Sequence, residues 1–239
     1  MQYIMMPLNE HYDSGFGAIA EAFHHAAMRL KETKPTTAFF EHLPLSFLFR
    51  HSVELFLKSG IVILHRRLKL SYDAKPHDTE PMVSVGGKWK PIYTVHGIGD
   101  LYSYWKALIE PRTDELKEMC KFKPDWTIGP EADEWIKTID QTDPSSTYFR
   151  YPSTRDPVED QKKSPFKKTS QEDLFPPDRP EDKKIVALVI ENADGEFVKA
   201  YMQEKDSEEE KVYLDALEEA SKMLFCYHAM MRIEITGGF

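Results

Sequence analysis

Four ionisable residues lie at helical spacing within an otherwise apolar stretch of this chain. The stretch covers residues 45–64 and contains Arg50, His51, Glu54 and Lys58. Residues four apart lie on the same side of an α-helix, so Arg50, Glu54 and Lys58 are expected to form a row of alternating charge. A helix that is apolar on nearly all sides is buried, and buried charges are costly unless they are paired. The row is therefore either a structural ion-pair network or one wall of a polar site.

A polar site would need further side chains from other parts of the chain, and two segments offer them. His96 and Asp100 flank a short turn with two glycines, and Arg150 and Tyr151 lie in an aromatic segment at 148–152. A histidine can transfer protons near neutral pH, and an arginine can hold a phosphate group. We therefore expect these segments to converge on the charged row if it forms a site.

The same three segments resemble motifs of the HEPN superfamily. Residues 50–58 are similar to its H-x-x-E-L-x-L-K helix, residues 96–101 to its H-D-L-x-x-L segment, and residues 149–152 to an F-R-Y-P segment of some members. The resemblance covers about residues 43–110 and 148–152. It implies an all-α bundle that often dimerises, belongs to prokaryotic toxin–antitoxin or antiviral systems, and in many members cleaves RNA without a metal.

One feature departs from that family. Its catalytic members carry an arginine followed, after four to six residues, by a histidine, and no arginine of this sequence has a histidine at that distance. Two hypotheses remain open: a defence or toxin protein that acts on RNA or a nucleotide through a non-standard site, or a non-catalytic module that dimerises or docks onto an operon-encoded partner. For the first, the predicted catalytic residues are His51 and His96, and the predicted substrate-binding residues are Arg50, Glu54, Lys58, Asp100, Arg150 and Tyr151.

A metal site is an alternative use of some of these side chains. His51 and Glu54, with His96 or Asp100, could supply ligands for a divalent ion. Di-metal helical bundles use the reversed order Glu-x-x-His and repeat it, whereas this chain has no second copy. We therefore predict neither a metal nor another cofactor.

Composition restricts the class of protein further. A net charge of −9 argues against a protein that coats nucleic acid by charge alone. The two cysteines, Cys120 and Cys226, form no CxxC motif, which fits a reducing compartment. The N-terminal residues lack the basic and apolar regions of a signal peptide, and the longest apolar run is too short to span a bilayer. We expect a soluble cytoplasmic homodimer without a membrane partner.

The elements that must position these residues are mainly helical. The sequence pattern predicts one domain over residues 1–239, a helical bundle with a small β-hairpin and a long polar loop. Residues 71–97 fit a small hairpin or an ordered loop, and residues 185–202 fit either a hairpin or a short buried helix. Residues 152–184 are polar and proline-rich, so we expect an exposed or partly disordered loop. The predicted helices cover residues 14–31, 43–68, 101–110, 113–121, 130–140 and 208–231.

Overall fold

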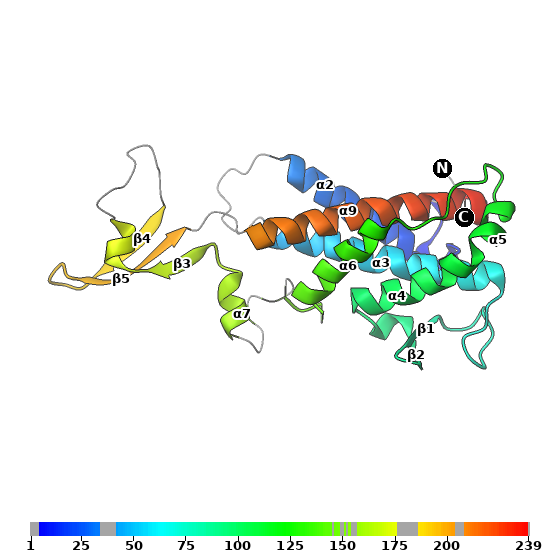
Figure 1. Ribbon diagram of the computed structural model, residues 1–239, viewed down its shortest axis with the longest axis horizontal. Helices are drawn as coiled ribbons and strands as arrows, with labels where there is room; N and C mark the ends of the chain where they lie inside the picture. The colour runs from blue at the N-terminus through cyan, green and yellow to red at the C-terminus, as the bar shows by residue number, and fades with distance from the viewer. Residues whose placement is uncertain are drawn as a thin grey trace.

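The protein is mainly α-helical with a small β element, as predicted, and its strands form two small antiparallel sheets. We describe a computed structural model of the chain over residues 5–33, 42–144, 146–148, 151, 153, 157–175, 186–203 and 208–238. The helical body is built from three long helices and two shorter ones (Figure 1). The long helices are α2 (Phe16–Glu32), α3 (His42–Leu68) and α9 (Glu208–Met230), and the shorter ones are α4 (Ile98–Ile109) and α6 (Pro130–Thr142).

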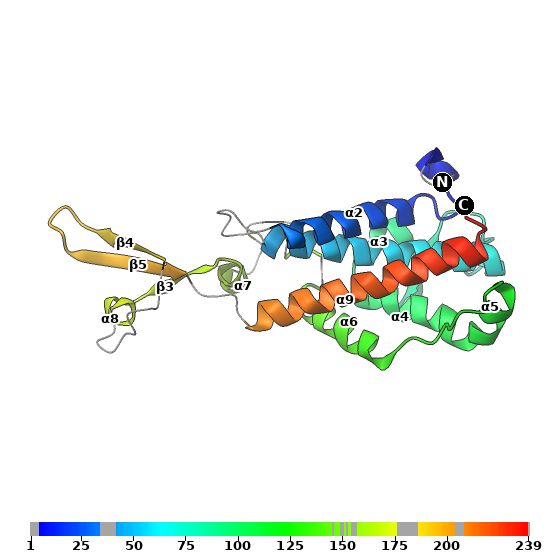
Figure 2. The same cartoon turned by 90° about the horizontal axis from the view of Figure 1, so that it is seen from above.

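Helix α3 lies at the centre of the body, which explains its apolar character. It packs against α2, α4 and α9, while α6 completes the body by packing on α4 and α9 (Figure 2). Side chains on all sides of α3 are buried: the consecutive residues Ile61, Val62, Ile63 and Leu64, which point in four different directions, are at most 2% exposed. A helix that is covered on several sides needs apolar residues on each of them. The described helices include none long and apolar enough to cross a membrane.

Short elements connect and extend these helices. They are η1 (Leu8–Glu10), η2 (Ile92–Thr94), η3 (Glu110–Arg112), α5 (Thr113–Met119), α7 (Pro157–Lys162), α8 (Gln171–Leu174) and the π-helical turn η4 (Met231–Ile235). Strands β1 (Met82–Val85) and β2 (Lys88–Pro91) form a hairpin, so the first of the two readings of residues 71–97 is confirmed. Gly86 and Gly87 make its turn with φ of 58° and 75°, which glycine adopts without strain.

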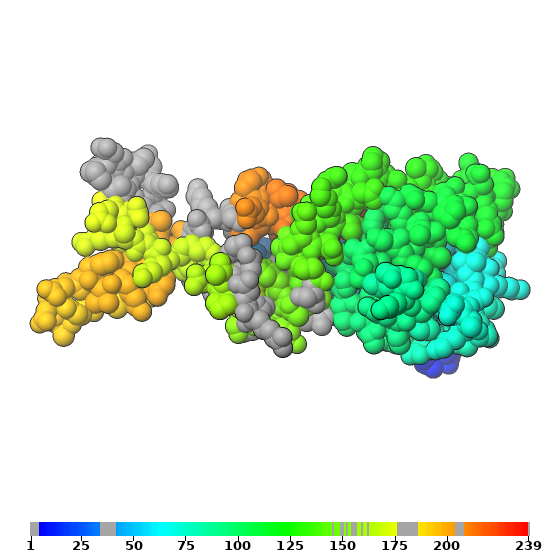
Figure 3. All heavy atoms as spheres, turned by 60° about the horizontal axis from the view of Figure 1, so that its bottom comes forward, coloured from blue at the N-terminus to red at the C-terminus, as the bar shows by residue number. Residues whose placement is uncertain are grey.

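A second sheet lies beyond one end of the helical body and projects from it (Figure 3). Its strand order is β3 (Phe166–Thr169), β5 (Phe197–Gln203), β4 (Ala187–Glu191). The hairpin reading of residues 185–202 is therefore confirmed over the residues that form β4 and β5. The polar segment 152–184 differs from the expected loop, because its described residues 157–174 include α7, β3 and α8. The sequence pattern of this segment gave no sign of a strand because β3 is held by β5, which lies much later in the chain.

Candidate functional site

Glu54 lies at the centre of a buried polar network on α3. Its Oε1 accepts hydrogen bonds from Lys58 Nζ at 2.8 Å and from His96 Nδ1 at 2.9 Å, and its Oε2 accepts one from Arg50 Nη1 at 3.2 Å. The side chains of Arg50, Glu54 and Lys58 are only 2–3% exposed. The predicted row of alternating charge on one face of the helix is thus confirmed. His96 joins it from the segment that precedes α4.

Arg50 connects this network to the end of α6. Its Nη2 donates to the backbone oxygens of His96 at 2.9 Å and Asp143 at 3.4 Å, and its Nε lies 2.9 Å from Asp143 Oδ2 in an ion pair. Asp143 follows α6 directly, and its Oδ1 accepts hydrogen bonds from the backbone N–H groups of Thr147 and Tyr148. Sequence reasoning missed Asp143, because its partner is 93 residues away and no local spacing connects them.

The charges of the network balance one another. Burial alone would raise the pKa of Glu54, but Lys58, His96 and Arg50 together lower it below its ordinary value. Glu54 is therefore ionised at neutral pH. Two cations, Arg50 and Lys58, then face two carboxylates, Glu54 and Asp143, and neither cation reaches solvent.

His96 is the member of this network that reaches solvent. Its side chain is 42% exposed, compared with 2% for Glu54. Because an ionised carboxylate only accepts hydrogen bonds, the Nδ1 that faces Glu54 carries a proton. In the neutral ring, Nε2 then has a free lone pair, and no described residue forms a hydrogen bond with it. A histidine oriented in this way can take a proton from a solute molecule.

The predicted site residues His51 and Asp100 have surroundings different from those of His96. The ring of His51 packs edge-on against Phe23 of α2 at 4.5 Å between centroids and stacks on Phe47 at 5.7 Å. His51 therefore lies in an aromatic setting against α2, while His96 contacts Glu54 from the α4 side. Asp100 is exposed in the first turn of α4.

The aromatic segment at 148–152 is described only in part. Tyr151 is exposed, and its backbone oxygen accepts a hydrogen bond from Lys163 Nζ at 3.1 Å. The predicted phosphate contact Arg150 lies outside the described residues. The described part of the chain contains no group of three or more His, Cys, Asp or Glu side chains that could hold a metal ion.

A second buried polar cluster contains a serine and a histidine. Ser59 Oγ lies 3.1 Å from His228 Nδ1 and 2.6 Å from Asp13 Oδ2, and both Ser59 and His228 are buried. The Ser59 hydroxyl donates its hydrogen bond to the Asp13 carboxylate. His228 Nδ1 is therefore the donor in its hydrogen bond with Ser59 Oγ and cannot remove a proton from that hydroxyl. Asp13 also accepts hydrogen bonds from Gly15 N and Gly17 N at the start of α2. The cluster therefore fixes α2 to α3 and α9 and provides no activated nucleophile.

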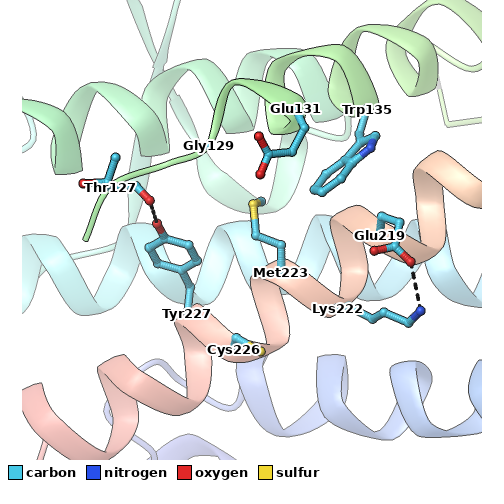
Figure 4. A pocket seen from close by; sticks show the side chains of 9 residues that line it. All are labelled: Thr127, Gly129, Glu131, Trp135, Glu219, Lys222, Met223, Cys226 and Tyr227. Atoms are coloured by element: carbon cyan, nitrogen blue, oxygen red, sulfur yellow. Dashed lines mark hydrogen bonds and ion pairs between the residues drawn. The ribbon is translucent and has the colours of Figure 1, made fainter. Parts of the chain in front are cut away.

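An open groove lies between the segment 127–135 and α9. It has a volume of about 330 Å³. Figure 4 shows the carboxylate of Glu131, the ring of Trp135 and the side chain of Met223 around its centre. Lys222, also in the lining, is paired with Glu219 at 2.9 Å. The groove contains none of the predicted site residues, and its full lining is Thr127, Gly129, Glu131, Trp135, Glu219, Lys222, Met223, Cys226 and Tyr227.

Comparisons of the chain with models of protein families, with curated proteins and with solved structures find no match.

Proposed function

We propose that this protein is a HEPN-like helical protein of a prokaryotic defence or toxin system that acts on RNA or a nucleotide, with His96 as the proton-transferring residue. The observation that carries the proposal is the pair formed by His96 and Glu54, 2.9 Å apart. A buried carboxylate orients the ring and fixes its tautomer, and the outer nitrogen faces solvent. Such a histidine is suited to removing the proton of a ribose 2′-hydroxyl or of an attacking water.

The segments that carry the family resemblance support the substrate class. Residues 50–58 supply Glu54 and residues 96–101 supply His96, and these two segments meet at the hydrogen bond between them. In this proposal Arg50 and Lys58 position Glu54 rather than contact substrate, because they are buried and paired. The charge that neutralises a phosphate must come from elsewhere, and Arg150 remains our prediction for that role, together with Tyr151 as a neighbouring contact. Asp100 stays a predicted substrate-binding residue.

The test is cleavage of labelled RNA and turnover of nucleotides by the purified protein. His96→Ala is expected to reduce the rate by about 10²–10⁴-fold, which is the usual contribution of a general acid or base. His77→Ala is the matched control, because it removes a partly exposed histidine outside the network and should leave the rate unchanged. His51→Ala tests the other predicted catalytic histidine. The rate should stay unchanged in this variant unless His51 also takes part in catalysis. Absence of turnover by the wild-type protein, or full activity of His96→Ala, would overturn the proposal.

A second candidate is a non-catalytic HEPN-like module that dimerises or docks onto an operon-encoded partner. The observation that favours it is the complete pairing of the buried charges, which suits a purely structural network. Co-expression with the products of neighbouring genes, followed by purification and measurement of turnover, separates the two. A stable complex without turnover supports the module, and turnover by the isolated chain contradicts it.

A further inference from the structure

The projecting sheet has two edges with opposite character. The order β3–β5–β4 puts β3 on one edge and β4 on the other. Strand β3 carries Lys167 and Lys168, whereas β4 has the sequence Ala-Leu-Val-Ile-Glu without lysine, arginine or proline. Charged residues and proline are the usual means by which edge strands avoid pairing with other chains. Strand β4 lacks basic residues and proline along its whole length.

Apolar side chains along β4 are exposed to solvent. Leu188 is 56% exposed, Val189 37%, and Val186 just before the strand 48%. Val186 and Leu188 point to one face of the sheet and Val189 to the other, because neighbouring residues of a strand alternate. Val198 on the neighbouring strand β5 is also exposed, at 55%. A run of β-branched and aliphatic residues on an open strand edge is a site at which further strands add.

The hydrogen-bond pattern shows which backbone groups of β4 face outward. Gln203 N donates to Val186 O at 2.8 Å, and Asn192 N donates to Glu196 O at 2.9 Å, so residues 186 and 192 bond toward β5. Antiparallel ladders alternate, so 188 and 190 also bond toward β5. The register shifts between Ile190 and Glu191, but the extra residue lies on β5, so the alternation along β4 is kept. The backbone N–H and C=O groups of Ala187, Val189 and Glu191 therefore point away from the sheet. No described strand pairs with them.

The β4 edge can form a complete set of backbone hydrogen bonds with the same edge of a second copy. A second copy in antiparallel orientation, with a two-fold axis at Val189, would pair Val189 with Val189 and Ala187 with Glu191 of the other copy. Each residue whose N–H and C=O groups point outward then lies opposite a residue of the second copy with the same orientation, so the two can exchange hydrogen bonds. Leu188 would lie opposite Ile190 of the second copy, which buries apolar side chains, and Glu191 would face an alanine rather than a like charge. The strand register and the placement of charges are thus both compatible with pairing to a second copy of this chain.

We propose that this protein forms a homodimer through antiparallel pairing of β4 with β4 of a second copy, which joins the two sheets into one continuous sheet. The pairing is isologous, as the two-fold symmetry of a homodimer requires. It lies away from His96 and does not depend on the proposed function, so His96→Ala leaves the dimer unchanged.

The first test uses proline on the open edge. Val189→Pro removes an outward N–H but none of the bonds from β4 to β5, because proline is tolerated on an edge where its nitrogen faces solvent. Light scattering is expected to show a dimer for the full wild-type chain and a monomer for Val189→Pro, with unchanged circular dichroism. Val198→Ala, which removes an exposed apolar side chain from the central strand, is the control and should stay dimeric. A monomeric wild-type chain, or a dimer that persists in Val189→Pro, overturns the proposal.

A second test does not depend on how well the proline variant folds. Paired residues in a hydrogen-bonded antiparallel pair have Cα atoms about 5.5 Å apart, which is within reach of a short thiol-specific crosslinker. In a Cys226→Ser background, which removes the exposed natural thiol, Val189→Cys is expected to give a covalent dimer with that crosslinker. Val198→Cys in the same background should remain uncrosslinked. Equal crosslinking of both variants, or none for Val189→Cys, contradicts the β4 interface.

Discussion

The buried ion pair between Glu54 and Lys58 should contribute far more to stability than an exposed pair of the same spacing. Both side chains are 2–3% exposed, and Glu54 is the one carboxylate that the described structure places on Lys58. Glu54→Gln leaves this ammonium group buried with only a neutral amide to face. Breaking a buried pair in this way costs about 3–5 kcal/mol, a large part of the roughly 5–15 kcal/mol that stabilises a typical domain.

The chain offers a matched control for this substitution. Lys106 and Glu110 also lie four residues apart, at the end of α4 and 3.5 Å from each other, but their side chains are 23% and 56% exposed. Because water screens this pair, Glu110→Gln should cost at most about 1 kcal/mol. The comparison holds the spacing and the substitution constant. It changes the burial, and it also leaves the ammonium group of Lys106 paired, because Asp133 Oδ1 lies 2.7 Å from it.

Urea unfolding followed by circular dichroism measures both free energies. If the cost of Glu54→Gln comes from the unpaired ammonium group, Lys58→Met in the same chain should recover much of it, so the two effects are strongly non-additive. A cost for Glu54→Gln no larger than that for Glu110→Gln would refute the reasoning. Simple addition of the Glu54→Gln and Lys58→Met costs would refute it as well.

Two further predictions concern packing and pH. A change from glycine to alanine normally favours a helix, but Gly60→Ala should destabilise the protein by about 1–3 kcal/mol, because a Cβ there would lie 2.6 Å from Trp105 Nε1. Thermal unfolding measures the effect, and a raised Tm would contradict the prediction. Burial lowers the pKa of His65, so the unfolded chain binds protons more readily and stability falls as the pH drops through about 6.5. His65→Gln should flatten the dependence of Tm on pH in that range, and an unchanged slope would count against this.

The sequence by itself determined the local elements. The long apolar stretch with charges at every fourth position predicted the central helix and the row formed by Arg50, Glu54 and Lys58, because helical spacing is a property of neighbours in the chain. The glycine pair at 86–87 between two short β-compatible segments likewise fitted a tight hairpin turn. These features required no information about distant parts of the chain.

Only the tertiary structure decided which distant groups complete the network. His96 is 42 residues from Glu54, and Asp143 is 93 residues from Arg50, so no spacing rule relates them. His51 and His96 looked equivalent in the sequence, yet packing put one ring between aromatic side chains and the other between a carboxylate and solvent.

The projecting sheet shows the same division. Residues 185–202 fitted a strand pair or a buried helix equally well, and the segment 152–184 fitted a loop, until β5 paired with both β4 and β3. Strand formation depends on a partner that supplies hydrogen bonds, whereas a helix forms its own within a few residues. The sequence therefore determined the long helices and the charged row on α3 but not the short helices α7 and α8, and the fold alone decided which side chains meet and which edge of the described sheet stays open.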